Sequence, residues 1–213
     1  MEKIKNKIGI YKYKSSNINS LLNALEMISI QYEVSENFSE IAKYKKIILP
    51  GVGNMKNFSP FLISELSKKI NTFLEEEGII YGICLGLQLL LDKNEEANIN
   101  TTGFIKGDCI SLKNKFDIKL NVGFQSLKFS EDHLKDKTIC NLFKGIDLNS
   151  KFYFLHKYFC NVNENKNYKV INTTLKNKHL PSLFIKKNIL GTQFHPELSN
   201  NVGLKFLSNF SKL

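Results

Sequence analysis

Two short runs of the chain are rich in apolar residues: residues 45–51 (KKIILPG), which are apolar after two lysines, and residues 78–84 (GIIYGIC), which are apolar throughout. A strand with one face in water alternates apolar and polar residues, so continuous runs are typical of strands buried on both faces. Between them, residues 58–77 have the apolar spacing of an amphipathic helix, with Pro60 tolerated in its first turn. Because a strand, a helix and a second buried strand form a βαβ unit, the sequence predicts a parallel sheet flanked by helices.

The pattern changes between the two halves of the chain. The first half begins with an expected strand at 6–13, a helix at 18–29 and a strand at 31–35. The second half predicts short strands with turns between them, a loop and a last helix. The strands are expected near 103–112, 118–129, 151–160, 168–175, 181–186 and 189–195, the loop at 161–169 and the helix at 202–213. Without a repeat or a low-complexity linker, we predict one domain over residues 1–213, α/β first and then more antiparallel.

The charge of the chain is strongly positive, at a net +10. Every basic residue is a lysine, and the lysines are scattered. Because arginine supplies much of phosphate and base recognition, we expect no nucleic-acid partner. Apolar runs stay well short of the roughly 18 residues that a membrane span requires, and the first residues lack a signal-peptide pattern. We therefore expect a cytoplasmic protein that does not bind membranes.

The four cysteines show no CxxC pair and no spacing to histidine that suits zinc. We therefore expect no metal, and no cofactor is predicted. In a reducing cytoplasm a disulfide is also not expected. Cys109, Cys140 and Cys160 are interpreted as small apolar side chains. Cys84 differs, because it lies where a predicted strand turns into a helical pattern.

Cys84 lies at the centre of the sequence Gly82-Ile83-Cys84-Leu85-Gly86. This is the form of a nucleophile elbow, in which crowding at a sharp turn requires small residues two positions before and after the nucleophile. A helix beginning near Leu85 would favour a thiolate, and the Leu85 N–H would face an oxyanion on the attacked carbonyl. The motif alone fits a turn with a buried cysteine equally well.

Two other segments favour the catalytic interpretation. Pro50-Gly51-Val52-Gly53 follows a buried strand, at the sheet edge where α/β proteins bind ligands, and offers a second oxyanion donor near Val52. A simple turn remains the alternative there. In residues 191–199 (GTQFHPELS), Pro196 favours an extended backbone at His195. His195 and Glu197 would then project to one side as a base and its orienting carboxylate.

The remaining histidines, His133, His156 and His179, have no such neighbour in the sequence and are interpreted as surface or structural residues.

Together, GICLGLQLL, PGVG and TQFHPE resemble the motifs of the class I, or triad, glutamine amidotransferases, in the same order and over nearly the whole chain. The resemblance implies a flavodoxin-like α/β fold, with a largely parallel central sheet and added antiparallel strands in the second half. It implies that Cys84 is the nucleophile, His195 the base and acid, and Glu197 the group that orients His195. The resemblance also implies an oxyanion hole formed by Leu85, Gly51 and Val52. The substrate-binding residues that it implies are Gln88, Gly53, His156, Lys157 and Tyr158.

Within that class, the chain most resembles the glutaminase subunits of imidazole glycerol phosphate synthases. The similarity lies in residues 10–26, with Tyr13, Asn17 and Ser20 at matching positions, in FYFLHKYF (152–159) and in the last helix. It implies that glutamine is hydrolysed to glutamate and ammonia. The ammonia would pass to a (β/α)8-barrel cyclase in a heterodimer, which would make imidazole glycerol phosphate and AICAR in histidine biosynthesis.

The chain also departs from that group. Lys12 and Lys14 stand where an acid and a glycine are usual, and Lys157 and Leu198 replace a serine and a lysine. Residues 120–125 (LNVGFQ) replace the pattern Pro-His-x-Gly-Trp-Asn.

None of these departures changes the predicted nucleophile, base or acid. Several lie where the chain would meet its partner, so other partners and functions stay open. The alternatives are a paralogue that supplies a sugar amidotransferase for polysaccharide modification, a stand-alone cysteine amidohydrolase, and a non-enzymatic interaction protein.

Overall fold

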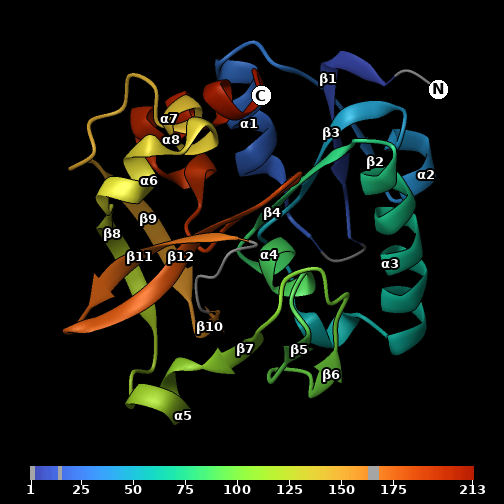
Figure 1. Cartoon of the computed structure of the whole chain (residues 1–213). Helices are drawn as coiled ribbons and strands as arrows, with labels where there is room; N and C mark the ends of the chain where they lie inside the picture. Colours follow the sequence, from blue (N-terminus) through green and yellow to red (C-terminus); the bar gives the residue numbers. More distant parts are fainter. Residues whose placement is uncertain (1–2, 14–15, 163–167) are drawn as a thin grey trace.

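The computed structural model describes residues 3–13, 16–162 and 168–213, and within them one large sheet of nine strands forms the centre of an α/β structure (Figure 1). Five neighbouring strands are parallel. They are, in order across the sheet, β2 (Gln31–Ser35), β1 (Ile4–Tyr11), β3 (Tyr44–Leu49), β4 (Ile79–Ile83) and β13 (Ile189–Thr192). The sheet continues with antiparallel strands. These are β12 (Lys178–Lys186), β11 (Lys169–Leu175), β8 (Asn121–Lys128) and β9 (Lys151–His156).

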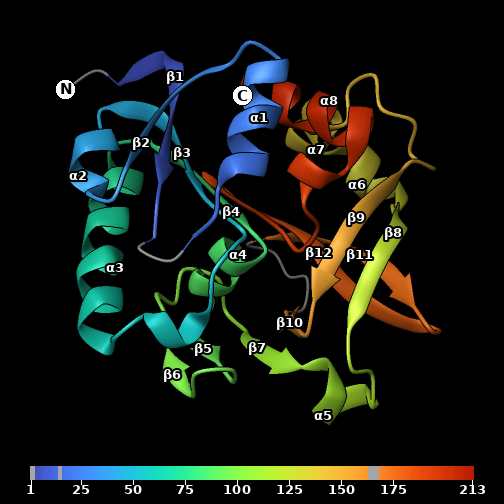
Figure 2. The same cartoon turned by 180° about the vertical axis from the view of Figure 1, so that it is seen from behind.

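Helices cover both faces of the parallel part (Figures 1 and 2). On one face lie α1 (Asn19–Met27), α7 (Lys137–Leu142) and α8 (Asn200–Phe210), with α6 (Glu131–Lys135) beside α7. On the other lie α2 (Phe38–Ile41), α3 (Pro60–Glu75) and α4 (Leu85–Leu89). A second, small sheet lies below α4 in Figure 1. It contains β10 (Tyr158–Asn161), β7 (Asp108–Ser111), β5 (Lys93–Asn94) and β6 (Ile99–Asn100).

The two apolar runs are buried parallel strands, as predicted. Successive residues of β3 and β4 belong to different cores: Ile47 and Ile80 face α2 and α3, whereas Ile48 and Tyr81 face α1 and α8. Each of these four side chains is fully buried. Because both faces of these strands are covered, a polar side chain on either face would lose its hydration, which explains the continuous hydrophobic runs.

Several boundaries differ from the prediction. The expected strand at 151–160 is two strands, β9 and β10, which belong to different sheets and are separated at Lys157. The expected strand at 103–112 is confined to β7 and is followed by a helix, α5 (Leu112–Phe116). Part of the predicted loop at 161–169, and Lys14 of the N-terminal pattern, lie outside the described residues.

The short helices α2, α6 and α7 were missed because none has room for a repeated apolar pattern. Each has an N-cap side chain that accepts a backbone N–H, namely Asn37, Ser130 and Asp136. These capping residues were the local signal for them.

Gly86 has a structural role at the turn between β4 and α4. A Cβ atom there would clash with the backbone carbonyl of Leu49 in β3, and one at Gly82 would lie 2.6 Å from Leu87 N. Backbone atoms cannot rotate away as a flexible side chain can. The two glycines therefore allow α4 to begin directly against the sheet.

We predict that Gly86→Ala lowers the free energy of unfolding by about 3 kcal/mol, because the added methyl group forces the turn away from β3. Gly145→Ala is the control. Unlike Gly86, it has a left-handed φ, of +71°, and its Cβ would meet only the end of the Lys205 side chain. The left-handed backbone alone gives an expected loss of about 1 kcal/mol. Urea denaturation measures both, and equal losses would contradict the role given to Gly86.

Candidate active site

Cys84 occupies the sharp turn that the elbow motif predicts. Its backbone angles, φ 42° and ψ −97°, lie outside the helical and strand regions, and it is the N-cap of α4. The turn is fixed by hydrogen bonds on both sides: Cys84 N donates to Thr192 O at 2.6 Å, and Gln88 N donates to Cys84 O at 3.0 Å. Strained backbone of this kind persists only where its surroundings enforce it, and it clusters at functional sites.

His195 and Glu197 form the predicted pair. His195 Nδ1 lies 2.8 Å from Glu197 Oε1, and both side chains are about 95% buried. The carboxylate can only accept, so the proton on Nδ1 faces Glu197 and Nε2 is left for chemistry. One detail of the prediction was wrong. The extended backbone ends at His195, and Glu197 belongs to a short 3₁₀ helix, Pro196–Leu198. The carboxylate still reaches the ring because this turn folds it back.

The segment bearing His195 is attached to β9. His195 N donates to Tyr153 O at 2.8 Å, and the Ser199 hydroxyl both donates to His195 O at 2.6 Å and accepts from Tyr153 N at 2.9 Å. Ser199 was not among the predicted residues, since a serine after a His-Pro-Glu motif has no chemistry of its own.

Charge and contact couple His195 to Cys84. Burial by itself lowers the pKa of His195, but the Glu197 carboxylate and the Cys84 sulfur, which is hydrogen-bonded to the ring, together raise that pKa well above its usual value. A Cβ at Gly51 would lie 2.8 Å from His195 Cε1, so the loop after β3 packs directly on the imidazole. The structure therefore brings together Cys84, His195 and Glu197, the candidates for the nucleophile, the base and the orienting carboxylate.

A small cavity of about 230 Å³ opens beside Cys84. Most of the residues predicted for the substrate and the oxyanion line it. They are Gly51, Gly53, Leu85, Gln88, His156, Lys157 and Tyr158, and Glu96, Leu120 and Leu155 complete the wall. Val52 does not line it and packs instead, half-buried, against the core on the α1 side of the sheet. Glu96 was missed because it lies in an irregular segment between short strands, where no spacing marked it.

His156 is a buried, neutral histidine at the cavity wall. Its pKa is lowered to about 3, chiefly by burial and also by nearby His195, while the hydrogen bond to Tyr158 O acts in the opposite direction. Nδ1 lies 2.9 Å from that carbonyl and Nε2 lies 2.9 Å from Asn121 Nδ2, which assigns the proton to Nδ1. The sequence predicted His156 to be a surface or structural residue, and its burial fits a structural role. Its side chain also borders the cavity, as the resemblance implied.

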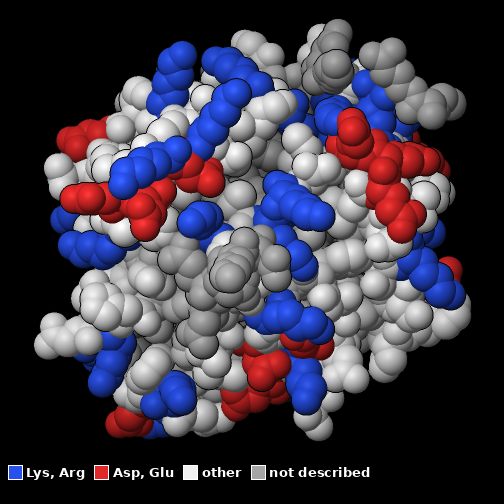
Figure 3. All heavy atoms as spheres, viewed as in Figure 1, with Lys and Arg blue, Asp and Glu red and all other residues white. Residues whose placement is uncertain are grey.

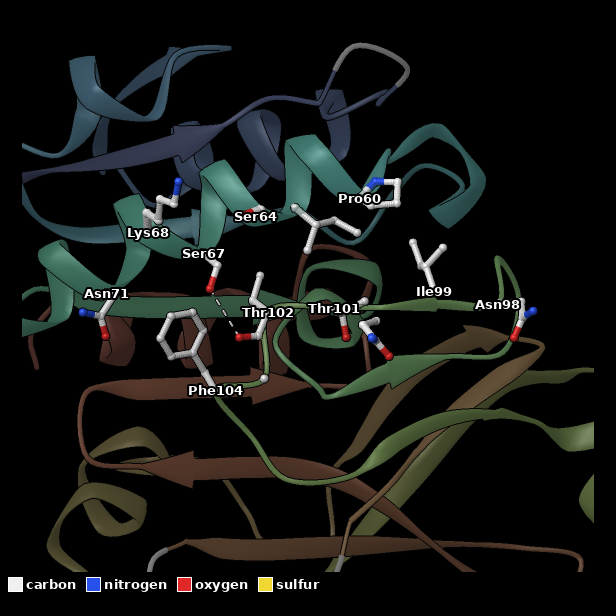
Figure 4. Close-up of a pocket in the computed structure, with 13 residues that line it drawn as sticks. Pro60, Ser64, Ser67, Lys68, Asn71, Asn98, Ile99, Thr101, Thr102 and Phe104 are labelled. Atoms are coloured by element: carbon white, nitrogen blue, oxygen red, sulfur yellow. Dashed lines mark hydrogen bonds between the residues drawn. The ribbon is translucent and has the colours of Figure 1, made fainter.

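A larger cavity, of about 840 Å³, lies elsewhere, between α3 and residues 98–104 (Figure 4). It is open, and its wall combines polar residues such as Ser64, Ser67 and Lys68 with apolar ones such as Ile99 and Phe104. None of the predicted site residues lines it. The face seen in Figure 3 carries lysines at many places with acidic side chains between them.

Among the described residues, no group of three or more histidine, cysteine or acidic side chains could hold a metal ion. A search of the same residues for a helix long and apolar enough to cross a bilayer finds none.

Comparison with known proteins shows the family of the chain. The family model of class-I glutamine amidotransferases matches residues 10–212. Solved structures with this fold include PurLQS from Thermotoga maritima (TM-score 0.68, 18% identity, 98% of this chain and 99% of that one) and a glutamine amidotransferase (TM-score 0.66, 15% identity, 97% and 99%). The chain therefore belongs to the class-I glutamine amidotransferases.

Relatives with higher sequence identity show which group of this class the chain belongs to. The imidazole glycerol phosphate synthase subunit HisH of Methanocaldococcus jannaschii is 36% identical over 97% of this chain and 99% of its own length. The HisH subunit of Buchnera aphidicola is 35% identical over 93% and 95% of the two chains, and that of Bacillus subtilis 31% over 97% and 96%. The chain belongs to the family of HisH subunits.

The neutrality of His156 predicts a pH dependence of stability. The unfolded chain binds a proton at this histidine near pH 6.5, whereas the folded chain binds it only near pH 3, so acidification between these values favours unfolding. We expect the free energy of unfolding of the parent to fall as the pH is lowered from about 6 to about 4. The fall should be steeper than that of His156→Gln, by about 1.4 kcal/mol per pH unit. His179→Gln, at an exposed histidine, should keep the parental slope. Parallel curves for parent and His156→Gln would contradict the assignment.

Proposed function

We propose that this chain is a glutaminase that hydrolyses glutamine through Cys84, His195 and Glu197 and delivers ammonia to a synthase partner. The observation that supports this most is the joint placement of the three groups. Cys84 is held at a strained turn, His195 is hydrogen-bonded to it, and Glu197 holds the other side of the imidazole. Membership of the HisH family supports the choice of substrate.

In the proposed reaction, the Cys84 thiolate attacks the side-chain amide carbon of glutamine. The tetrahedral oxyanion would be stabilised by the Leu85 N–H and the loop of Gly51 and Val52. His195 gives its proton to the departing ammonia, which leaves a thioester on Cys84. His195 then takes a proton from water, the resulting hydroxide attacks the thioester carbon, and glutamate and the thiolate are released.

The cavity fits a small amino acid. Glu96 and Lys157 bring opposite charges to its wall, where they would face the α-ammonium and α-carboxylate of glutamine. Gln88, 5% exposed, lies one helical turn after Cys84, and its Oε1 accepts from Asn94 at 3.4 Å. Its amide nitrogen would remain for the substrate. Gly53, His156 and Tyr158 would shape the rest of this pocket.

The partner would cover an apolar strip on the antiparallel edge of the sheet. Val122 and Phe124 of β8 face outward beside their partners Leu155 and Tyr153 of β9, and Leu120 precedes them. Between 40% and 54% of the surface of Leu120, Val122, Phe124 and Leu155 is exposed. Leu120 and Leu155 also line the cavity. A partner seated on this strip would therefore close the cavity and receive ammonia before water protonates it.

We propose that this partner is the (β/α)8-barrel cyclase of an imidazole glycerol phosphate synthase, in a heterodimer in the cytoplasm. The named relatives are subunits of that synthase.

The catalytic assignment is tested with Cys84→Ala and His195→Ala. Each should lower glutamine-dependent synthesis of imidazole glycerol phosphate at least a thousandfold, because the two residues act as one unit. Synthesis from added ammonium salt should persist in the complex with the cyclase. Glutamine-dependent synthesis by Cys84→Ala would overturn the assignment. A parent that hydrolyses glutamine but makes no product with the cyclase would instead reject the partner.

The docking strip is tested with Phe124→Asp. Burying an unpaired carboxylate in the interface should weaken binding to the cyclase at least about tenfold, measured by isothermal titration calorimetry. Leu134→Asp is the matched control, since Leu134 on α6 is 46% exposed and Phe124 is 45% exposed. Equal effects of the two variants, or none, would exclude the strip as the docking face.

A further inference from the structure

Gln193 lies beside Cys84 and has no place in the reaction described above. It follows the last residue of β13 and is only 1% exposed. Gly191 packs on Leu87 of α4, and because side chains alternate along extended backbone, Gln193 and His195 lie on that same side. Gln193 Nε2 lies 3.6 Å from Cys84 Sγ and donates a hydrogen bond to it. The sulfur therefore contacts two side chains of one segment.

The small sheet fixes which end of the amide faces the sulfur. Leu112 N donates to Lys157 O at 3.0 Å, so these two residues form a hydrogen-bonded pair. Hydrogen-bonded and non-hydrogen-bonded pairs alternate along antiparallel strands. Three residues further along, Cys160 and its partner Cys109 therefore form a non-hydrogen-bonded pair. The Cys160 N–H consequently points away from β7. It donates to Gln193 Oε1 at 3.2 Å.

A reversed amide would be unfavourable at both ends. It would place two N–H groups against each other at Cys160 and a carbonyl oxygen against the sulfur. Because Cys160 N is buried backbone and can only donate, it requires the carbonyl of Gln193. The amide nitrogen is then left to face Cys84, whatever the protonation state of the sulfur.

We propose that Gln193 is a catalytic residue that donates a hydrogen bond to the Cys84 thiolate, alongside His195, and so holds the nucleophile charged and in position. This inference rests on the proposed role of Cys84. The Gln193 amide would give the thiolate a hydrogen-bond donor that keeps its proton throughout the reaction, whereas His195 transfers its proton to ammonia during each turnover. The second donor would act when the thioester breaks down and the sulfur leaves as a thiolate.

The alternative role for Gln193 is purely structural, as a link between β13 and β10. Two substitutions separate the roles. Gln193→Glu is nearly the same shape and keeps an acceptor for Cys160 N, but it lacks the N–H donor and places a negative charge at the sulfur. Gln193→Met lacks both the donor and the acceptor. A structural role predicts that Met is the more harmful change and that neither affects the chemistry of the sulfur.

The experiment measures the rate at which iodoacetamide alkylates Cys84 as a function of pH. The parent carries Cys140→Ser, because Cys140 is exposed, whereas burial raises the pKa of Cys109 and Cys160 and keeps them unreactive. We expect both Gln193 variants to react at least about tenfold more slowly than the parent at pH 7 and to approach the parental rate in alkaline solution. In the complex, kcat for glutamine should fall more than KM changes.

Gln88→Met is the control for loss of a buried glutamine near Cys84. No hydrogen bond joins Gln88 to the sulfur among the described residues, so this variant should raise KM for glutamine and keep the parental alkylation profile. Parental profiles for Gln193→Glu and Gln193→Met would overturn the proposal.

If neither Gln193 variant folds, the side-chain amide resonances of Gln193 in the parent provide the test. They should shift as Cys84 titrates, and resonances that stay fixed would overturn the proposal. Failure of the proposed function is seen separately, in a parent that still hydrolyses glutamine after Cys84 has been alkylated.

Discussion

The parallel pairing of β4 with β13 is the constraint on which the site depends. These strands come from opposite ends of the chain, yet Ile83 pairs with Thr192, and Cys84 N donates to Thr192 O. Each strand ends at this point, so the residue after β4 and the segment after β13 leave the sheet together. Cys84 and His195 meet because the two strands share one register. A shift of one residue would turn Gln193 and His195 to the opposite face of the sheet.

Close backbone packing around this pairing explains the glycines of the motifs. Gly82 and Gly86 let α4 start against β3 and β4, and Gly51 lets the loop after β3 lie against the imidazole. None of these three glycines has a positive φ. Their role is therefore space for neighbouring atoms, whereas Cys84 itself takes the unfavourable backbone angles. The strain is concentrated at the residue whose side chain must project from the turn.

The sequence predicted the parallel half of the sheet and the turn at Cys84 well, because both depend on local signals. A buried strand next to an amphipathic helix, and a cysteine between glycines, can be recognised from neighbouring residues alone. The antiparallel half was predicted less well. Lys157 interrupts what reads as one strand, and the sequence does not say that β9 and β10 join different sheets. Glu96, Ser199 and the contacts of Gln193 were missed, because they depend on residues brought together only by the fold.

The break at Lys157 connects the two sides of the site. Before it, Leu155 of β9 belongs to the exposed apolar strip and His156 to the cavity wall. After it, the Tyr158 carbonyl accepts from His156, and the Cys160 N–H orients Gln193 toward the sulfur. Had the strand continued straight into the large sheet, the alternation of its residues would have kept these groups in one ladder. Because the chain turns here, residues within the short segment 155–160 reach an exposed edge, the cavity beside Cys84 and the amide of Gln193.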